Sequence, residues 1–291
     1  EPLGVRVAWL AGKVTGKARA TVLAQVASGE AQVVVGTHAL MQEAVVFHDL
    51  GLAIVDEQHR FGVHQRLALR DKGAGGDRVP HQLVMTATPI PRTLAMAAYA
   101  DLDVSAIDEL PPGRTPVQTV ALSAERRPEL VERIRTACAE GRQAYWVCTL
   151  IDDSDEVVAQ AAQTTFETLS ASLSALRVAL VHGRMKAADK QATMRRFKLG
   201  EVDLLVATTV IEVGVDVPNA SLMIIENAER LGLAQLHQLR GRVGRGATAS
   251  TCVLMYQPPL SMMARHRLAT MRETNDGFVI AEKDLELRGP G

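Results

Sequence analysis

Short apolar runs alternate with amphipathic segments along almost the whole chain, and this alternation limits the possible folds more than any other feature of the sequence. It is typical of βα units, in which parallel strands lie between helices. The runs are rich in Val, Ile and Leu and nearly continuous, as expected of strands that helices cover on both faces. The predicted strands are 5–10, 32–35, 52–55, 83–86, 118–121, 144–148, 177–181, 203–207, 222–225 and 251–255.

A weak internal repeat groups these strands into two lobes. Residues 29–37 align with residues 200–208, and a second buried strand follows in each copy. That second strand ends at the acidic pair Asp56-Glu57 in the first copy, whereas the matching position 226–227 holds only one acidic residue. Short matches also occur between unrelated βα units, but two successive matching units favour a duplicated α/β lobe.

The boundary between the lobes is predicted at segment 110–116, which contains three prolines and one glycine. Such a segment cannot continue a helix or a central strand, so we expect a hinge there. The chain begins close to a strand pattern and stops at 288–291 without a polar tail. We therefore expect it to be an internal piece of a longer protein.

The composition excludes several classes of protein. The 291 residues are 47% hydrophobic and 22% charged, which is ordinary for a globular protein of two domains. The net charge of −1 neither requires nor excludes a nucleic-acid partner. Aromatic residues make up only 3%, so base stacking is not expected to dominate binding. The three cysteines lack metal-ligand spacing, and no apolar run is long enough to span a membrane, which predicts a cytosolic protein.

Two adjacent carboxylates, Asp56 and Glu57, directly follow the predicted strand 52–55. They should therefore lie at the carboxyl end of a parallel sheet, where open α/β folds bind ligands. Such a pair suits ATP hydrolysis, with Asp56 holding Mg²⁺ through water and Glu57 orienting the attacking water. The alternative is an acidic pair on a solvated loop, and these two residues alone do not decide between the two.

The next predicted strand leads into a Thr-Ala-Thr-Pro segment that contains Thr86 and Thr88. Hydroxyl groups at a strand end can bond the carboxylates of a neighbouring strand and so relay whether phosphate is present. We assign this coupling role to Thr86, Thr88, Arg92 and His59. The segment on its own would indicate only a stiff turn.

Closely spaced arginines and glycines fill the segment 238–246. Guanidinium groups suit the charge on a transferring γ-phosphate, and glycines allow close backbone approach. Arg242 and Arg245 are therefore candidate arginine fingers, and Gln238 is a candidate nucleotide contact. Arg240 is instead assigned to nucleic-acid phosphate, and a purely DNA-binding role of the whole loop is the alternative.

The strand predicted at 203–207 leads into a further polar segment. Gly214 permits a tight turn, and Asp216 is a candidate contact to the ribose or to the arginines. Thr208 and Thr209 suit contacts to a nucleic-acid backbone. A plain strand end capped by hydroxyls is the alternative.

Thr37 and His38 are the counterparts of these threonines in the first copy of the repeat. They predict a second backbone contact on the other lobe. Two equivalent phosphate grips on lobes that open and close are the minimum needed to step along a strand.

Together these elements, in this order, resemble the motor motifs of superfamily 2 helicases. The segments 55–63, 85–93 and 108–114 resemble the branch that contains RecG and the transcription-repair coupling factor. Three further segments resemble the RecG family in particular, and they are 144–148, 181–185 and 275–291.

The resemblance implies two RecA-like α/β lobes with parallel sheets, as in P-loop NTPase helicases, the first truncated at its amino terminus. The implied divisions are a partial first lobe at 1–112, a second lobe at 113–258 and the start of a helical hairpin at 259–291. It also implies an ATP- and Mg²⁺-dependent translocase on branched double-stranded DNA. Stalled forks and Holliday junctions would be its substrates in recombination and repair. It implies a monomer in the bacterial cytoplasm, associated with the nucleoid and not with a membrane.

One motif of the resembled family is missing. The sequence contains no Gly-Lys-Thr or Gly-Lys-Ser phosphate loop, and the spacing within 12–17 does not fit one. That segment is predicted to open a helix that runs toward residue 27. We therefore expect this chain alone to be a weak or inactive ATPase.

Other functions are compatible with the same motifs. A transcription-repair coupling factor or a replication-restart helicase would use a similar motor, and RNA is a possible substrate. A non-catalytic DNA-binding module is the alternative from another class. The retained acidic pair and arginines argue against it, because a site that had lost its catalytic activity would have no physical need for them.

Overall fold

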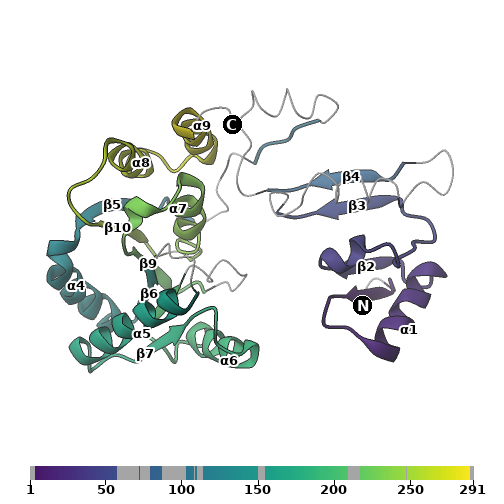
Figure 1. The fold of residues 1–291 in the computed structure, drawn as a ribbon, viewed down its shortest axis with the longest axis horizontal. Coiled ribbons are helices and arrows are strands. Elements are labelled where there is room, and N and C mark those ends of the chain that lie inside the picture. The colour runs from purple at the N-terminus through teal and green to yellow at the C-terminus, as the bar shows by residue number, and fades with distance from the viewer. Residues whose placement is uncertain are drawn as a thin grey trace. The chain divides into compact units, whose positions relative to one another are not determined.

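The computed structural model describes residues 4–57, 72, 79–86, 103–107, 109, 114–149, 155–208, 217–246 and 248–288. The chain divides into two compact units, Glu1–Ala87 and Thr88–Gly291, which are described separately (Figure 1). None of the helices in these ranges is both long and apolar enough to cross a membrane.

The first unit begins with a βαβ arrangement. Strand β1 (Val7–Leu10) pairs in parallel with β2 (Val33–Gly36), and helix α1 (Gly16–Ala27) connects them. The predicted helix toward residue 27 is therefore confirmed. Leu10 and Val26 are buried in a small core between α1 and the strands, and the short 3-10 helix η1 (His38–Met41) follows β2.

A second pair of strands completes the described part of the first unit. Strand β3 (Leu52–Val55) pairs in parallel with β4 (His81–Val84). Side chains alternate along β3, so that Ala53 and Val55 are buried while Leu52 and Ile54 are exposed.

Among the described residues, helices cover only one face of the β1–β2 pair, whereas the sequence predicted cover on both faces. Trp9 is 57% exposed, and its neighbours on alternate positions are exposed as well. Because α1 is the one long helix described in this unit, it covers one face of the β1–β2 pair and leaves the other open to solvent. The exposed apolar side chains of these strands are Val7, Trp9, Val33, Val35, Leu52, Ile54 and Leu83.

The second unit is built on a six-stranded parallel sheet with the order β5-β10-β9-β6-β8-β7 (Figure 1). All strand pairs in it are parallel, as the alternation of strands and helices predicts. The strands are β5 (Gln118–Ser123), β6 (Gln143–Cys148), β7 (Val178–Val181), β8 (Leu204–Thr208), β9 (Ala220–Ile225) and β10 (Thr251–Tyr256).

Helices cover both faces of this sheet, and the central strand β6 contributes to both cores. Tyr145 and Val147 point into one core, which also contains Phe197. Trp146 and Cys148 point into the other, against helices on the opposite face. The helices are α4 (Arg127–Ala139), α5 (Asp155–Ser172), α6 (Ala187–Lys198), α7 (Leu233–Arg240), α8 (Met262–Glu273) and α9 (Gly277–Arg288), with the 3-10 helices η3 (Ala124–Arg126) and η5 (Ala228–Arg230).

Backbone conformation supports the predicted internal repeat. Gly29 and Gly200, which the repeat aligns, have φ angles of 75° and 74°. Among non-glycine residues of the described ranges, positive φ angles occur at Glu57 (54°) and Asn227 (49°), which also occupy matching positions after β3 and β9. Because left-handed backbone is uncommon outside glycine, this agreement is unlike a chance match between two βα units.

The three cysteines are free and buried, as the sequence predicted. Burial raises the pKa of the Cys252 thiol to about 12, which keeps it protonated at neutral pH. These thiols therefore behave as small apolar core residues.

Candidate nucleotide and nucleic-acid sites

The predicted acidic pair and its threonine partner lie at the same edge of a strand pair. Asp56 and Glu57 directly follow β3, and Thr86 lies two residues beyond the end of β4. The register aligns Val55 with Val84, and the amide of Met85 donates to the carbonyl of Val55 at 2.8 Å. The structure therefore brings Asp56, Glu57 and Thr86 to the carboxyl ends of two paired parallel strands.

The turn after β3 has an unusual backbone at Glu57, with a φ of 54°. The amide of Glu57 donates to Oδ1 of Asp56 at 2.8 Å, which holds the turn. Left-handed backbone at a residue other than glycine costs about 1–3 kcal/mol, and such strain often marks functional sites.

The acidic pair fits a hydrated divalent cation. Asp56 is exposed and Glu57 is half-buried. No group of three or more His, Cys, Asp or Glu side chains with metal-binding geometry occurs in the described ranges. Mg²⁺ usually keeps several waters and is held by one or two carboxylates together with substrate phosphates, so this donor set fits it.

The candidate backbone contacts of the two lobes differ in exposure. Thr37 and His38 follow β2 and are both exposed, and the Thr37 hydroxyl accepts a bond from the amide of Ala39 at 3.5 Å. Thr208 ends β8 and is only 2% exposed, and its Oγ1 has no hydrogen-bond partner among the described residues. The repeat thus places both threonines at strand ends but in different environments.

The predicted arginine fingers lie on a loop after α7, which we call the arginine loop (Gly241–Gly246). A Cβ added at Gly244 would meet Val117 and Ser250, and one added at Gly246 would meet Pro218. These contacts precede β5, β10 and β9, so the loop lies at the amino ends of three neighbouring parallel strands.

Within the second unit, the arginine loop therefore lies at the amino ends of the strands, whereas Thr208 lies at the carboxyl end of β8. The structure does not bring them together. On the loop, Arg242 is half-buried and Arg245 is exposed, with its Nε donating to the carbonyl of Gly241 at 3.3 Å. Gln238, one turn earlier on α7, is half-buried.

Arg240 has a different role from the predicted phosphate contact. Its side chain is buried, with only 3% of the residue exposed. The guanidinium donates to the carbonyls of Met271 and Thr274, both at 2.9 Å, and to the Thr119 hydroxyl at 3.3 Å. The prediction that Arg240 contacts nucleic acid is not retained, because its donors are directed to the end of α8 and to β5 inside the protein.

His237 completes this buried group. Its Nδ1 lies 3.1 Å from Nη2 of Arg240, so a neutral imidazole accepts a bond from the guanidinium. Burial, reinforced by the charge of Arg240, lowers the pKa of His237 to about 4.

The counterpart of the acidic pair in the second unit is neutralised by the protein itself. Glu226 follows β9, and its carboxylate accepts bonds from Arg127 at 2.6 Å and from the Trp146 indole at 3.0 Å. The guanidinium of Arg127 also lies 4.9 Å from the centre of the Trp146 ring. Sequence analysis missed this group because Arg127 and Glu226 are 99 residues apart in the chain.

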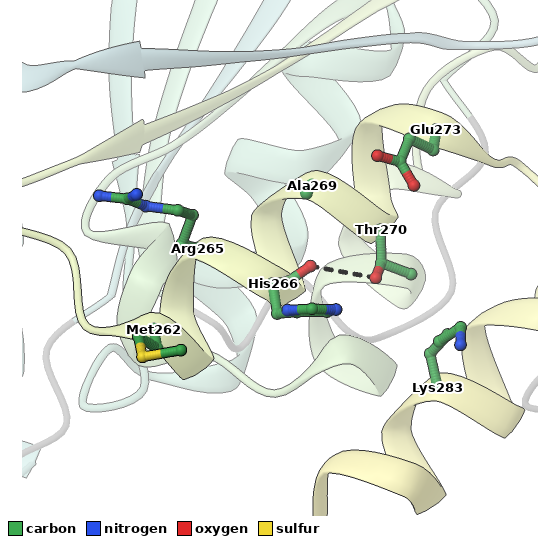
Figure 2. A pocket seen from close by; sticks show the side chains of 7 residues that line it. All are labelled: Met262, Arg265, His266, Ala269, Thr270, Glu273 and Lys283. Carbon is green, nitrogen blue, oxygen red and sulfur yellow. Dashed lines mark hydrogen bonds between the residues drawn. The ribbon is translucent and has the colours of Figure 1, made fainter.

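A groove of about 370 Å³ runs along α8 beside α9 (Figure 2). Its polar lining is already paired in part, since the Thr270 hydroxyl donates to the carbonyl of His266 at 3.0 Å and Lys283 pairs with Glu286. The groove contains none of the predicted site residues. Its lining residues are Met262, Arg265, His266, Ala269, Thr270, Glu273 and Lys283.

Several predicted site residues lie outside the described ranges. They are His59, Thr88, Arg92, Thr209, Gly214 and Asp216.

Comparisons with known proteins agree with the two-lobe organisation. Residues 1–97 match the DEAD/DEAH box helicase family, and residues 126–247 match the helicase conserved C-terminal domain. The whole chain is 69% identical to ATP-dependent DNA helicase RecG of Pasteurella multocida and 68% identical to that of Escherichia coli K12. It covers 42% of the length of each of these relatives.

A solved structure of RecG bound to a three-way DNA junction has the same fold. The two superpose with a TM-score of 0.74 at 45% identity, over 99% of this chain and 37% of that one. Two RecA-like α/β lobes are thus the fold of this chain, and over its whole length it is similar to the helicase RecG.

Proposed function

We propose that the protein is an ATP-dependent translocase on double-stranded DNA that acts on branched substrates such as stalled forks and Holliday junctions in recombination and repair. The observation that most supports this function is the acidic pair Asp56-Glu57 at the carboxyl end of β3, beside Thr86. The names of the RecG relatives and the junction bound to the solved RecG add support from outside the chain.

The acidic pair and the arginine loop have complementary roles in this proposal. Asp56 would hold Mg²⁺ through water, and the ion would supply charge neutralisation at the phosphates. Glu57 orients the attacking water, and Arg242 and Arg245 stabilise the charge that develops on the γ-phosphate. Gln238 contacts the nucleotide, and so do Gly214 and Asp216, which lie outside the described ranges.

Backbone contacts and coupling residues would convert hydrolysis into movement. The proposed nucleic-acid contacts are Thr37 and His38 in the first lobe and Thr208 and Thr209 in the second. Contacts of this kind to phosphate fix position without reading sequence, as a translocase requires. The proposed coupling residues are His59, Thr86, Thr88 and Arg92.

The proposed domains are a first lobe at 1–112, a second lobe at 113–258 and the start of a helical hairpin at 259–291, which would contain α8 and α9. We further propose a monomer associated with the bacterial nucleoid in the cytoplasm. Because the chain covers 42% of its relatives and contains no phosphate loop, we propose that residues 1–291 alone hydrolyse ATP poorly.

The test is ATP hydrolysis with and without forked DNA, measured for residues 1–291 and for a form with the full length of the relatives. The longer form should show fork-stimulated turnover that is lost in Glu57→Gln, while residues 1–291 stay near background. DNA binding by the longer form without any turnover would instead support a non-catalytic DNA-binding module. Fork-stimulated turnover by residues 1–291 would contradict the proposed need for a phosphate loop.

A further inference from the structure

Within the second unit, Arg114 contacts the arginine loop. Its Nε donates to the carbonyl of Gly244 at 2.7 Å, although the two residues are 130 positions apart. In the sequence, Arg114 lies within the segment 110–116 that is predicted to form a hinge. Gly244 lies between the candidate fingers Arg242 and Arg245.

The loop and the segment after Arg114 are packed closely at this point. Gly244 has a φ of 75°, and a Cβ built on it would lie 2.7 Å from Cγ2 of Val117. The next residue, Gln118, is fixed to the sheet because its amide donates to the carbonyl of Ser250 at 2.9 Å. A larger residue at position 244 would therefore force the loop and the segment at Val117 apart.

The arginine loop is thereby held from two sides. On the helix side, the buried Arg240 ties the end of α7 to the carbonyls at the end of α8. On the other side, the Arg114 side chain donates a hydrogen bond to the carbonyl of Gly244. A side chain outside the loop thus binds the backbone between the two candidate fingers.

We propose that Arg114 is a positioning residue that sets the geometry of Arg242 and Arg245. This inference rests on the proposed function of those two arginines in ATP hydrolysis. A misplacement of catalytic groups by about 1 Å can lower a rate about 100-fold, so one bond at this point has a large effect.

Two measurements test the proposal in a protein that has the full length of the RecG relatives. Hydrogen exchange of residues 241–246 reports the order of the arginine loop, and steady-state kinetics report kcat and KM for ATP with forked DNA. Arg114→Ala should speed exchange in the loop and lower kcat roughly 10- to 100-fold, with a smaller change in KM. Arg114→Lys, which retains a donor, should lie between it and the unmodified protein.

Arg126→Ala is the matched control, because Arg126 is exposed and pairs with Glu129 one turn along the chain. It should change neither readout. Gly244→Ala disturbs the same contact from the other side and should reproduce the effect of Arg114→Ala. Exchange in β6 (Gln143–Cys148), a fully buried strand, shows whether a variant has unfolded as a whole. If Arg114→Ala has unfolded, the milder variant Arg114→Lys provides the test.

The outcomes separate the positioning role from the proposed function. Unchanged loop exchange in both Arg114 variants overturns the positioning role, and so does faster loop exchange with unchanged kcat. A lower kcat with unchanged loop exchange also overturns it, since Arg114 would then act elsewhere. Failure of the unmodified protein to hydrolyse ATP would defeat the proposed function. Faster loop exchange in Arg114→Ala would in that case still establish the link between Arg114 and the loop.

Discussion

Arg240 shows how a residue's neighbours in space decide its role. In the sequence it is one of several closely spaced arginines, and nothing in that pattern separates it from Arg242 or Arg245. In the folded chain it is buried, whereas Arg245 is exposed. A buried guanidinium must be matched by acceptors, and here the carbonyls at the end of α8 provide them. The sequence could not predict this, because α8 is distant in the chain.

Replacing Arg240 by Ala is expected to lower the free energy of unfolding of the second unit by about 2–4 kcal/mol, because buried carbonyls lose charged donors. Urea denaturation followed by circular dichroism measures this change. Arg265→Ala, on the exposed side of α8, is the control and should cost little. If Arg240→Ala left stability intact and reduced the salt dependence of DNA binding, the original assignment to phosphate would be restored.

His237 predicts a pH dependence of stability. Its pKa in the folded chain is lowered to about 4 from the ordinary value of 6.5, so the unfolded chain takes up a proton at a higher pH than the folded chain. Stability should therefore be complete above about pH 6.5 and fall by up to roughly 3 kcal/mol as the pH drops toward 4. His237→Gln should flatten this decline in urea titrations at several pH values. An equally steep decline in the variant would assign it to other groups.

At the scale of elements, the strands were the most predictable part of the fold. Strands such as β3 and β6 begin and end within one or two residues of the predicted limits, because a buried parallel strand needs a continuous apolar run. The extent to which each face is covered was not predictable in the same way. The sequence pattern of β1 and β3 fits coverage on both faces, but the described helices of the first unit bury only one.

The two tryptophans report this difference between the units. Trp9 on β1 is 57% exposed, whereas Trp146 on β6 is fully buried beside Arg127. Acrylamide should quench the fluorescence of Trp9 strongly and that of Trp146 weakly. In Trp9→Phe, measured in residues 1–291, the remaining emission should be shifted to shorter wavelength and resist quenching. Strong quenching of that remaining emission would contradict the buried environment of β6.

At the scale of the whole molecule, the two units share a plan and differ in chemistry. Matching left-handed residues, Glu57 and Asn227, follow matching strands in both. In the first unit the acidic side chain at the strand end, Asp56, is exposed, whereas its counterpart Glu226 is neutralised by Arg127. This asymmetry is expected if one nucleotide serves two unequal lobes. The sequence revealed the acidic pair of the first copy. It did not reveal that Arg127 neutralises the acidic residue of the second copy.

Hydrolysis at the acidic pair is proposed to drive movement along duplex DNA. Displacement of a third strand from a triplex measures this movement directly, in the form with the full length of the RecG relatives. We expect ATP-dependent displacement that is abolished by Glu57→Gln and retained in Arg126→Ala, which alters only an exposed ion pair. Displacement that persists in Glu57→Gln, or binding to branched DNA with no displacement by the unmodified protein, would contradict this proposal.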